Sequence, residues 1–268
     1  MIIGFWSDRA GIGGTTSNMI ITGVMAAKET DREVILIQGK YDILKLDYAF
    51  SPGIRNDILK EDFGYYNHPG IDDVLEKHMN NLYTGKDFYE NLISVNQSNL
   101  LYMPGSIRNN PDLFRQKFQR VSQRFFKALK GLDKLIFIEL DSGMESLGRH
   151  MLNLLDLIVV NIGQGSKMIH DIKNQPILME KALFLIGRYD SNSKYNVRNM
   201  IRRQRINEDF VAVIPYSVKY QDSVNEGKTM EFVNRHYKCL KYEEDFSFFK
   251  EAGKASKMIL KRVNSIGT

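Results

Sequence analysis

The sequence predicts an α/β fold built on a three-layer, doubly wound and mainly parallel β-sheet. Seven short apolar runs, rich in β-branched residues, each have the length of a buried strand. Segments with helical apolar spacing separate most of them, and strands that alternate with helices in this way form parallel sheets covered on both faces. The runs are residues 1–6, 33–38, 99–103, 134–141, 156–162, 182–190 and 210–216.

A glycine-rich turn joins the first predicted strand to the first predicted helix. Gly11, Gly13 and Gly14 allow the backbone to come close to a bulky anion, and residues 15–17 place three hydroxyls at the helix start. The first amides of a helix have no partner within the helix and attract anions. The turn therefore predicts a phosphate-binding loop, and the alternative is a strand-to-helix turn that binds nothing.

Composition sets the broad class of the chain. Its 268 residues, of which 43% are hydrophobic, can bury the core of one large domain, and we expect a single domain over 1–268. The net charge of +5 permits attraction to nucleic acid or anionic lipid without requiring either. One cysteine, the lack of a leader-like segment, and apolar runs far below the roughly 20 residues of a membrane span predict a cytoplasmic protein.

The segment RAGIGGTT, residues 9–16, resembles the deviant Walker A loop of the MinD/ParA family of ATPases. That loop reads lysine, two glycines, any residue, glycine, lysine and two threonines. Here an arginine stands at the first lysine, Ala10 replaces the first glycine, and a glycine replaces the lysine that reaches the outer phosphates. The resemblance implies that ATP or ADP contacts Arg9, Gly11, Ile12, Gly13, Gly14, Thr15 and Thr16, and that Thr15 is a magnesium ligand.

The end of the second predicted strand carries Gln38, Gly39 and Lys40 where the family has aspartates. Fewer carboxylates and an added cation weaken the coordination of magnesium, which prefers oxygen ligands. Lys40 could supply phosphate affinity that the loop has lost. Alternatively, it is a solvated lysine after a strand.

The fourth predicted strand ends in Glu139 and Asp141, and alternation would place both carboxylates on one face. In a parallel sheet this end lies beside the first loop, so either carboxylate could hold magnesium through water. The segment resembles a Walker B strand, although the family has aspartate first. The alternative is that both acids simply end the strand.

The last two predicted strands extend the resemblance to about residue 232. Arg188 matches the arginine of the family's adenine-reading Asn-Arg pair, with Gly187 at the asparagine, and Pro215 lies in a segment similar to the adenine loop. The resemblance implies that Arg188 and Pro215 flank the base. The segments RYDSNSKYN and IPYS are similar to the TadZ/CpaE-like branch, whose members localise Tad pilus assembly machinery.

Two basic stretches have two interpretations each. Arg198, Arg202 and Arg205 share one helical face, which could bind DNA phosphates or form a solvated helix surface. A final helix, about 246–264, is amphipathic and basic, so it could contact a membrane peripherally or pack on the sheet. Residues 51–70, with His68, are expected to form a surface loop without a metal site.

From these patterns we expect a degenerate MinD/ParA-like protein that acts as a positioning or scaffold factor. The missing loop lysine and strand-end carboxylates predict that it binds ATP weakly or does not hydrolyse it, so no catalytic residue is assigned. Its expected partners are a second copy of the chain and proteins such as pilus-assembly machinery. The alternative is an active dimeric ATPase of the ParA/MinD type that binds DNA or membrane.

Overall fold

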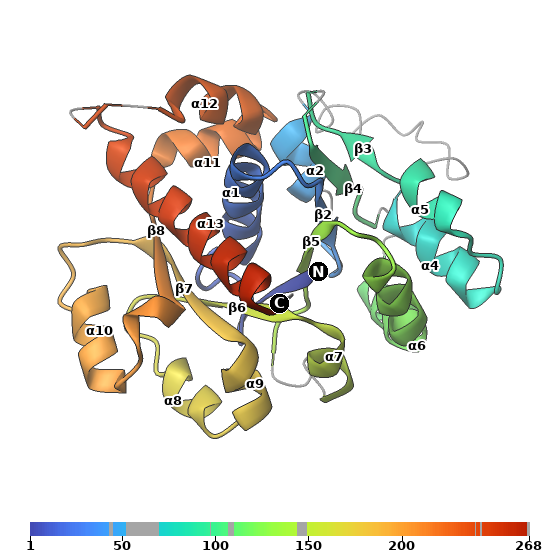
Figure 1. The fold of residues 1–268 in the computed structure, drawn as a ribbon, viewed down its shortest axis with the longest axis horizontal. Coiled ribbons are helices and arrows are strands. Elements are labelled where there is room, and N and C mark those ends of the chain that lie inside the picture. Colours follow the sequence, from blue (N-terminus) through green and yellow to red (C-terminus); the bar gives the residue numbers. More distant parts are fainter. Residues whose placement is uncertain are drawn as a thin grey trace.

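The sheet has eight strands in the order β3-β4-β2-β5-β1-β6-β7-β8 (Figure 1). The computed structural model describes residues 1–42, 45–51, 70–96, 98–106, 110–143, 149–238, 240–241 and 243–266. All strand pairs are parallel except β3 with β4. The strands are β1 Ile2–Trp6, β2 Val34–Gln38, β3 Ile93–Ser94, β4 Leu100–Met103, β5 Leu135–Glu139, β6 Leu157–Ile162, β7 Ala182–Tyr189 and β8 Val211–Pro215.

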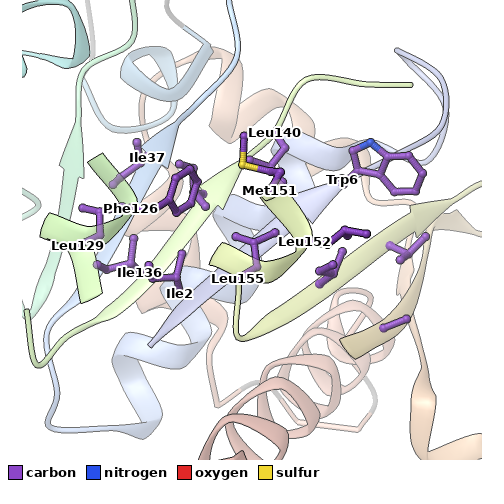
Figure 2. Close-up of a cluster of buried hydrophobic side chains, with 14 of the residues drawn as sticks. Ile2, Trp6, Ile37, Phe126, Leu129, Ile136, Leu140, Met151, Leu152 and Leu155 are labelled. Atoms are coloured by element: carbon purple, nitrogen blue, oxygen red, sulfur yellow. The ribbon is translucent and has the colours of Figure 1, made fainter. Parts of the chain in front are cut away.

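Alternation along the strands divides the core into two layers. In β1, Ile2 and Trp6 point into one buried cluster, whereas Ile3 and Phe5 point into the other. Figure 2 shows part of the first cluster, in which Ile2 and Trp6 lie with side chains from the helices on that face. Because both faces are covered, the seven apolar runs predicted from the sequence are all strands, and the doubly wound fold is confirmed.

Each cluster is covered by its own set of helices. Helices α4, α5, α6, α7, α8 and α9 contribute buried side chains to the cluster of Ile2, and α10 packs against it with partly buried ones. They are α4 Ile71–Met79, α5 Gly85–Glu90, α6 Pro111–Lys130, α7 Arg149–Leu154, α8 Met168–Lys173, α9 Pro176–Lys181 and α10 Val197–Gln204. The other face carries α1 Thr15–Glu29, α2 Lys45–Phe50, α11 Val218–Asn225, α12 Thr229–His236 and α13 Phe246–Ile266.

The terminal helix α13 packs on the sheet, as one of the two sequence interpretations predicts. Its apolar stripe, including Phe248, Ala252 and Ile259, is buried in the core beside α1 and β8 (Figure 1). Its lysines face outward. No described helix is long and apolar enough to cross a membrane.

The region predicted as a surface loop, residues 51–70, lies almost entirely outside the described residues, and so does His68. Strand β3 was not predicted. It has two residues at the edge of the sheet and pairs antiparallel with β4. No apolar run marks so short a strand.

Candidate functional site

A cleft of about 240 Å³ lies where the first glycine loop meets the carboxyl ends of β2, β5 and β7. In open α/β sheets this edge is where ligands bind. Helix α11 adds one wall through residues such as Asn225. Of the predicted site residues, the lining includes Gly11, Gly14, Thr15, Thr16, Lys40, Glu139 and Arg188. It does not include Arg9, Ile12, Gly13, Asp141 or Pro215.

The glycine loop has a backbone that other residues adopt only with strain. Gly11, Gly13 and Gly14 have φ of 77°, 81° and 67°, all in the left-handed region. Gly13 also packs tightly, because a Cβ there would lie 3.1 Å from the backbone of Ile162 in β6. The loop is therefore shaped by its glycines and by contact with the sheet.

Gly187 in β7 clamps the same loop from the other side. A Cβ at this position would lie only 1.8 Å from the carbonyl oxygen of Gly13. The side-chain amide of Asn18 donates to that oxygen at 2.7 Å and to Oδ1 of Asn161 at 2.8 Å. The sequence analysis did not assign a role to either asparagine. The sequence did contain one indication of such a role, because the polar Asn161 interrupts the apolar run 156–162.

The start of α1 presents unpaired amides to the cleft. Gly14 is the N-cap and offers no side-chain cap, and the first turn has no acidic residue. No carboxylate within the first turn therefore competes with a bound anion for the amides of Thr15, Thr16 and Ser17. This arrangement fits a phosphate group.

Glu139, at the end of β5, is fully buried beside this helix start. Its Oε1 accepts hydrogen bonds from Thr16 Oγ1 at 2.7 Å and from Lys40 Nζ at 2.9 Å. Burial raises the pKa of the Glu139 carboxyl, and Lys40 and Thr16 oppose that shift. Among the described residues, its Oε2 has no hydrogen-bond partner. A buried acceptor without a partner at a cleft wall points to a donor that a bound molecule brings.

Lys40 is held as a cation by two carboxylates. Its Nζ lies 2.9 Å from Glu139 and 3.5 Å from Asp42. Burial alone would lower the pKa of Lys40, but the attraction of Glu139 and then of Asp42 outweighs it and raises the pKa. Lys40 is therefore a fixed charge at the cleft wall, and the interpretation as a freely solvated lysine is wrong.

The donors expected for magnesium fit a divalent ion poorly. Thr15 lines the cleft, but one oxygen of Glu139 already binds an ammonium group. Asp141 lies two residues beyond the last strand residue, and its Oδ2 pairs with Arg115 Nε of α6 at 2.6 Å. The described residues contain no group of three or more metal-ligating side chains. An ammonium beside the carboxylate repels a second cation.

The Arg188 side chain lies beside the glycine loop. Its φ of 50° falls at the point where the pairing of β7 with β8 shifts register, between Ile186 and Tyr189. The Arg188 Nε lies 3.8 Å from the place where a Cβ on Gly14 would be. Pro215 pairs in register with Tyr189 and does not line the cleft.

Three other groups of predicted residues lie outside the cleft. The Arg9 side chain is 75% exposed and lies 3.7 Å from Asp8. Ile12 is 42% exposed. The three arginines at 198, 202 and 205 are also exposed, on α10 and at its end.

Solved structures of similar fold match nearly the whole chain. A ParA family ATPase from Chlorobium tepidum TLS superposes with a TM-score of 0.66 at 13% identity, covering 96% of this chain and 97% of that one. MinD from Pyrococcus horikoshii OT3, complexed with Mg-ADP, gives 0.65 at 16% identity, covering 99% and 98%. The fold is that of the MinD/ParA ATPases.

A third structure of the MinD/ParA fold, the MinC:MinD cell division complex of Aquifex aeolicus, has a TM-score of 0.62 at 16% identity and covers 97% of this chain and 96% of that one. No protein-family profile matches the sequence, and a search of curated protein sequences finds no match. At these identities the comparisons establish only the MinD/ParA fold. The chemistry of the cleft must therefore be inferred from the residues that line it.

Proposed function

We propose that the chain binds a nucleoside triphosphate in the cleft and works by positioning partner proteins, with little or no hydrolysis. The observation that carries this proposal is the convergence of the α1 amino terminus, Lys40 and Arg188 on one cleft. Unpaired amides and two cations are the features that bind a phosphate chain. The Mg-ADP bound to MinD of P. horikoshii supports the choice of a nucleotide over a simpler anion.

Slow hydrolysis follows from the groups that surround the phosphates. Position 14 has no side chain that could move with a transferring phosphoryl group, because it is a glycine with a left-handed backbone. Gln38 is buried and structural, since its amide donates to Asp42 O and accepts from Leu46 N. Phosphoryl transfer depends on positioned charge, and losing one stabilising donor typically costs about 100- to 1000-fold in rate.

Equilibrium dialysis with labelled ATP tests the proposal. We expect saturable binding in the micromolar to millimolar range and phosphate release at no more than a trace rate. No uptake at millimolar ATP would leave only a scaffold without nucleotide. Rapid phosphate release would instead support the alternative of an active dimeric ATPase.

The role of Arg9 distinguishes nucleotide binding by a single chain from hydrolysis by an active dimer. Its side chain is exposed and outside the cleft, so in a single chain it does not contact the phosphates. In an active dimer it would have to reach the nucleotide of a second copy. Arg9→Ala should leave ATP binding by the monomer unchanged, and a loss of turnover on this substitution would favour the dimeric ATPase.

The proposed partners are a second copy of the chain and pilus-assembly proteins of the Tad type. The second assignment is supported by the similarity of the RYDSNSKYN and IPYS segments to TadZ/CpaE-like proteins. The complex of MinD with MinC shows that this fold can carry a protein partner. Light scattering with and without ATP tests the homodimer, and copurification with tagged pilus-assembly proteins tests the second partner.

Nucleic acid is the second candidate partner, supported by the exposed arginines of α10. Arg198, Arg202 and Arg205 keep their guanidinium groups on the surface, and none forms an ion pair with a described residue. Salt-dependent retention on duplex DNA, reduced by Arg202→Ala, is the result expected from a phosphate-binding stripe. Absence of retention at low salt would end this candidate.

A further inference from the structure

Two cations line the cleft at positions that the deviant Walker A pattern does not use. The loop has no lysine, and Arg9 does not line the cleft. Lys40 arrives from the end of β2, and Arg188 arrives from the end of β7. The two cations therefore approach the glycine loop from strands on opposite sides of β1.

Arg188 stands next to the space that a side chain at position 14 would enter. Its Nε lies 3.8 Å from the Cβ position of Gly14, and its backbone has a left-handed φ of 50°. Among the described residues it has no ion pair and no hydrogen bond, so its guanidinium group is available to a ligand. Its backbone is held close to the loop, because the neighbouring Gly187 packs directly against Gly13.

Lys40 stands next to the carboxylate at which a divalent ion would be expected. Its ammonium nitrogen and the Thr16 hydroxyl share Glu139 Oε1. The second candidate carboxylate, Asp141, is paired with Arg115 and does not line the cleft. The site has thus one carboxylate for a metal, and that carboxylate is already neutralised by a protein cation.

We propose that Arg188 and the α1 amides bind the phosphate chain of the nucleotide and that Lys40 occupies Glu139 in place of a divalent ion, so that binding does not require a metal ion. In this arrangement Arg188 contacts the outer phosphates beside Gly14, and Lys40 stays paired with Glu139 and Asp42. The α1 amides fix the position of the phosphate chain, and the buried Oε2 of Glu139 accepts a hydrogen bond from a ligand-associated donor such as water. The inference rests on the proposed binding of a nucleoside triphosphate.

Dialysis of labelled ATP in excess EDTA and in millimolar Mg²⁺ tests the inference on the unmodified protein. We expect the two dissociation constants to agree within about threefold, well under 1 kcal/mol. Binding that is more than about tenfold tighter with Mg²⁺ would overturn the inference while leaving the proposed function intact. Absence of binding under both conditions would overturn both.

Arg188 has a matched control in the same chain. Arg205 is also an exposed arginine with a left-handed backbone, at φ 49°, but it lies at the end of α10 and does not line the cleft. Arg188→Ala should weaken metal-free ATP binding by roughly 10- to 100-fold, the value of a charge-assisted contact, and Arg188→Lys should recover part of the loss. Arg205→Ala should have no effect. Equal affinities of the Arg188→Ala and Arg205→Ala proteins would remove Arg188 from the site.

Lys40 needs a variant that keeps the core neutral. Lys40→Met alone would leave Glu139 charged and buried, so the test uses Lys40→Met together with Glu139→Gln. We expect this protein to bind ATP equally well in EDTA and in Mg²⁺, because the two substitutions remove a neutral pair together with the carboxylate that could hold the ion. Metal-free binding more than about tenfold weaker than in the unmodified protein would instead show that Lys40 acts on the phosphates directly.

Discussion

Gly187→Ala tests whether β7 fixes the glycine loop. The added Cβ would lie 1.8 Å from Gly13 O and 2.6 Å from Asn18 Nδ2, whereas real Cβ contacts stay above 3.0 Å. Both neighbours are held, because Asn18 donates to that same oxygen and also to Asn161. The loop must therefore move by about 1 Å and lose this hydrogen bond, and overpacking together with a buried unsatisfied group costs about 2–4 kcal/mol of unfolding free energy.

Urea denaturation measures this loss, and two other glycines separate its causes. Gly85→Ala adds a methyl group to open space without a left-handed backbone and should leave the urea midpoint nearly unchanged. Gly11→Ala also enters open space but at φ 77°, so it should cost about 1 kcal/mol from backbone strain alone. Gly187→Ala should be the least stable of the three and should also weaken ATP binding. A midpoint equal to that of Gly85→Ala would refute the clamp.

Three further substitutions test the buried polar groups. Lys40→Ala should lower the unfolding free energy by about 3–5 kcal/mol, because it leaves Glu139 as an uncompensated buried charge, and the double variant with Glu139→Gln should recover most of this in urea. Burial raises the pKa of Asp47 to about 6, so the free energy of unfolding should fall as the pH rises from about 4 to 6. Asp47→Asn should abolish this dependence on pH. Tyr220→Phe removes a 2.6 Å hydrogen bond to Ser17 O and should cost about 1 kcal/mol in urea.

Each of these expectations has an outcome that contradicts it. Lys40→Ala with unchanged stability would mean that Glu139 takes up a proton without cost. For Asp47, the group is protonated more readily in the folded state, so its contribution is present at low pH and is lost through its folded pKa. A stability that instead rises over that window in the unmodified protein, and equally in Asp47→Asn, would show that other groups dominate. An unchanged midpoint for Tyr220→Phe would show that water replaces the lost donor.

The strand content could be predicted from the sequence because burial on both faces leaves a direct trace. A strand covered by helices on both sides has no polar alternation, as in residues 157–162, where only Asn161 interrupts the apolar run. The edge strand β3 leaves no such trace. The loop was likewise predictable, because glycines close in sequence and followed by hydroxyls determine a local geometry.

The charge arrangement was less predictable because it depends on contacts between distant segments. Alternation put Glu139 and Asp141 on one face, but β5 ends at Glu139, and beyond a strand alternation no longer controls direction. Arg115, 26 residues earlier, then pairs with Asp141. Arg188 reaches Gly14 through a register shift that has no sequence signal.

A phosphate site built on backbone groups can take its positive charge from different segments. Glycine conformations and the amides of α1 fix where an anion lies, and they do not depend on which side chains surround it. A nearby cation adds attraction that depends on distance, whichever strand carries it. A lysine at position 14 would have to adopt the left-handed backbone of Gly14, and its Cβ would lie in ordinary contact with Arg188 Nε, at 3.8 Å. The loss of the loop lysine therefore does not by itself imply the loss of phosphate binding.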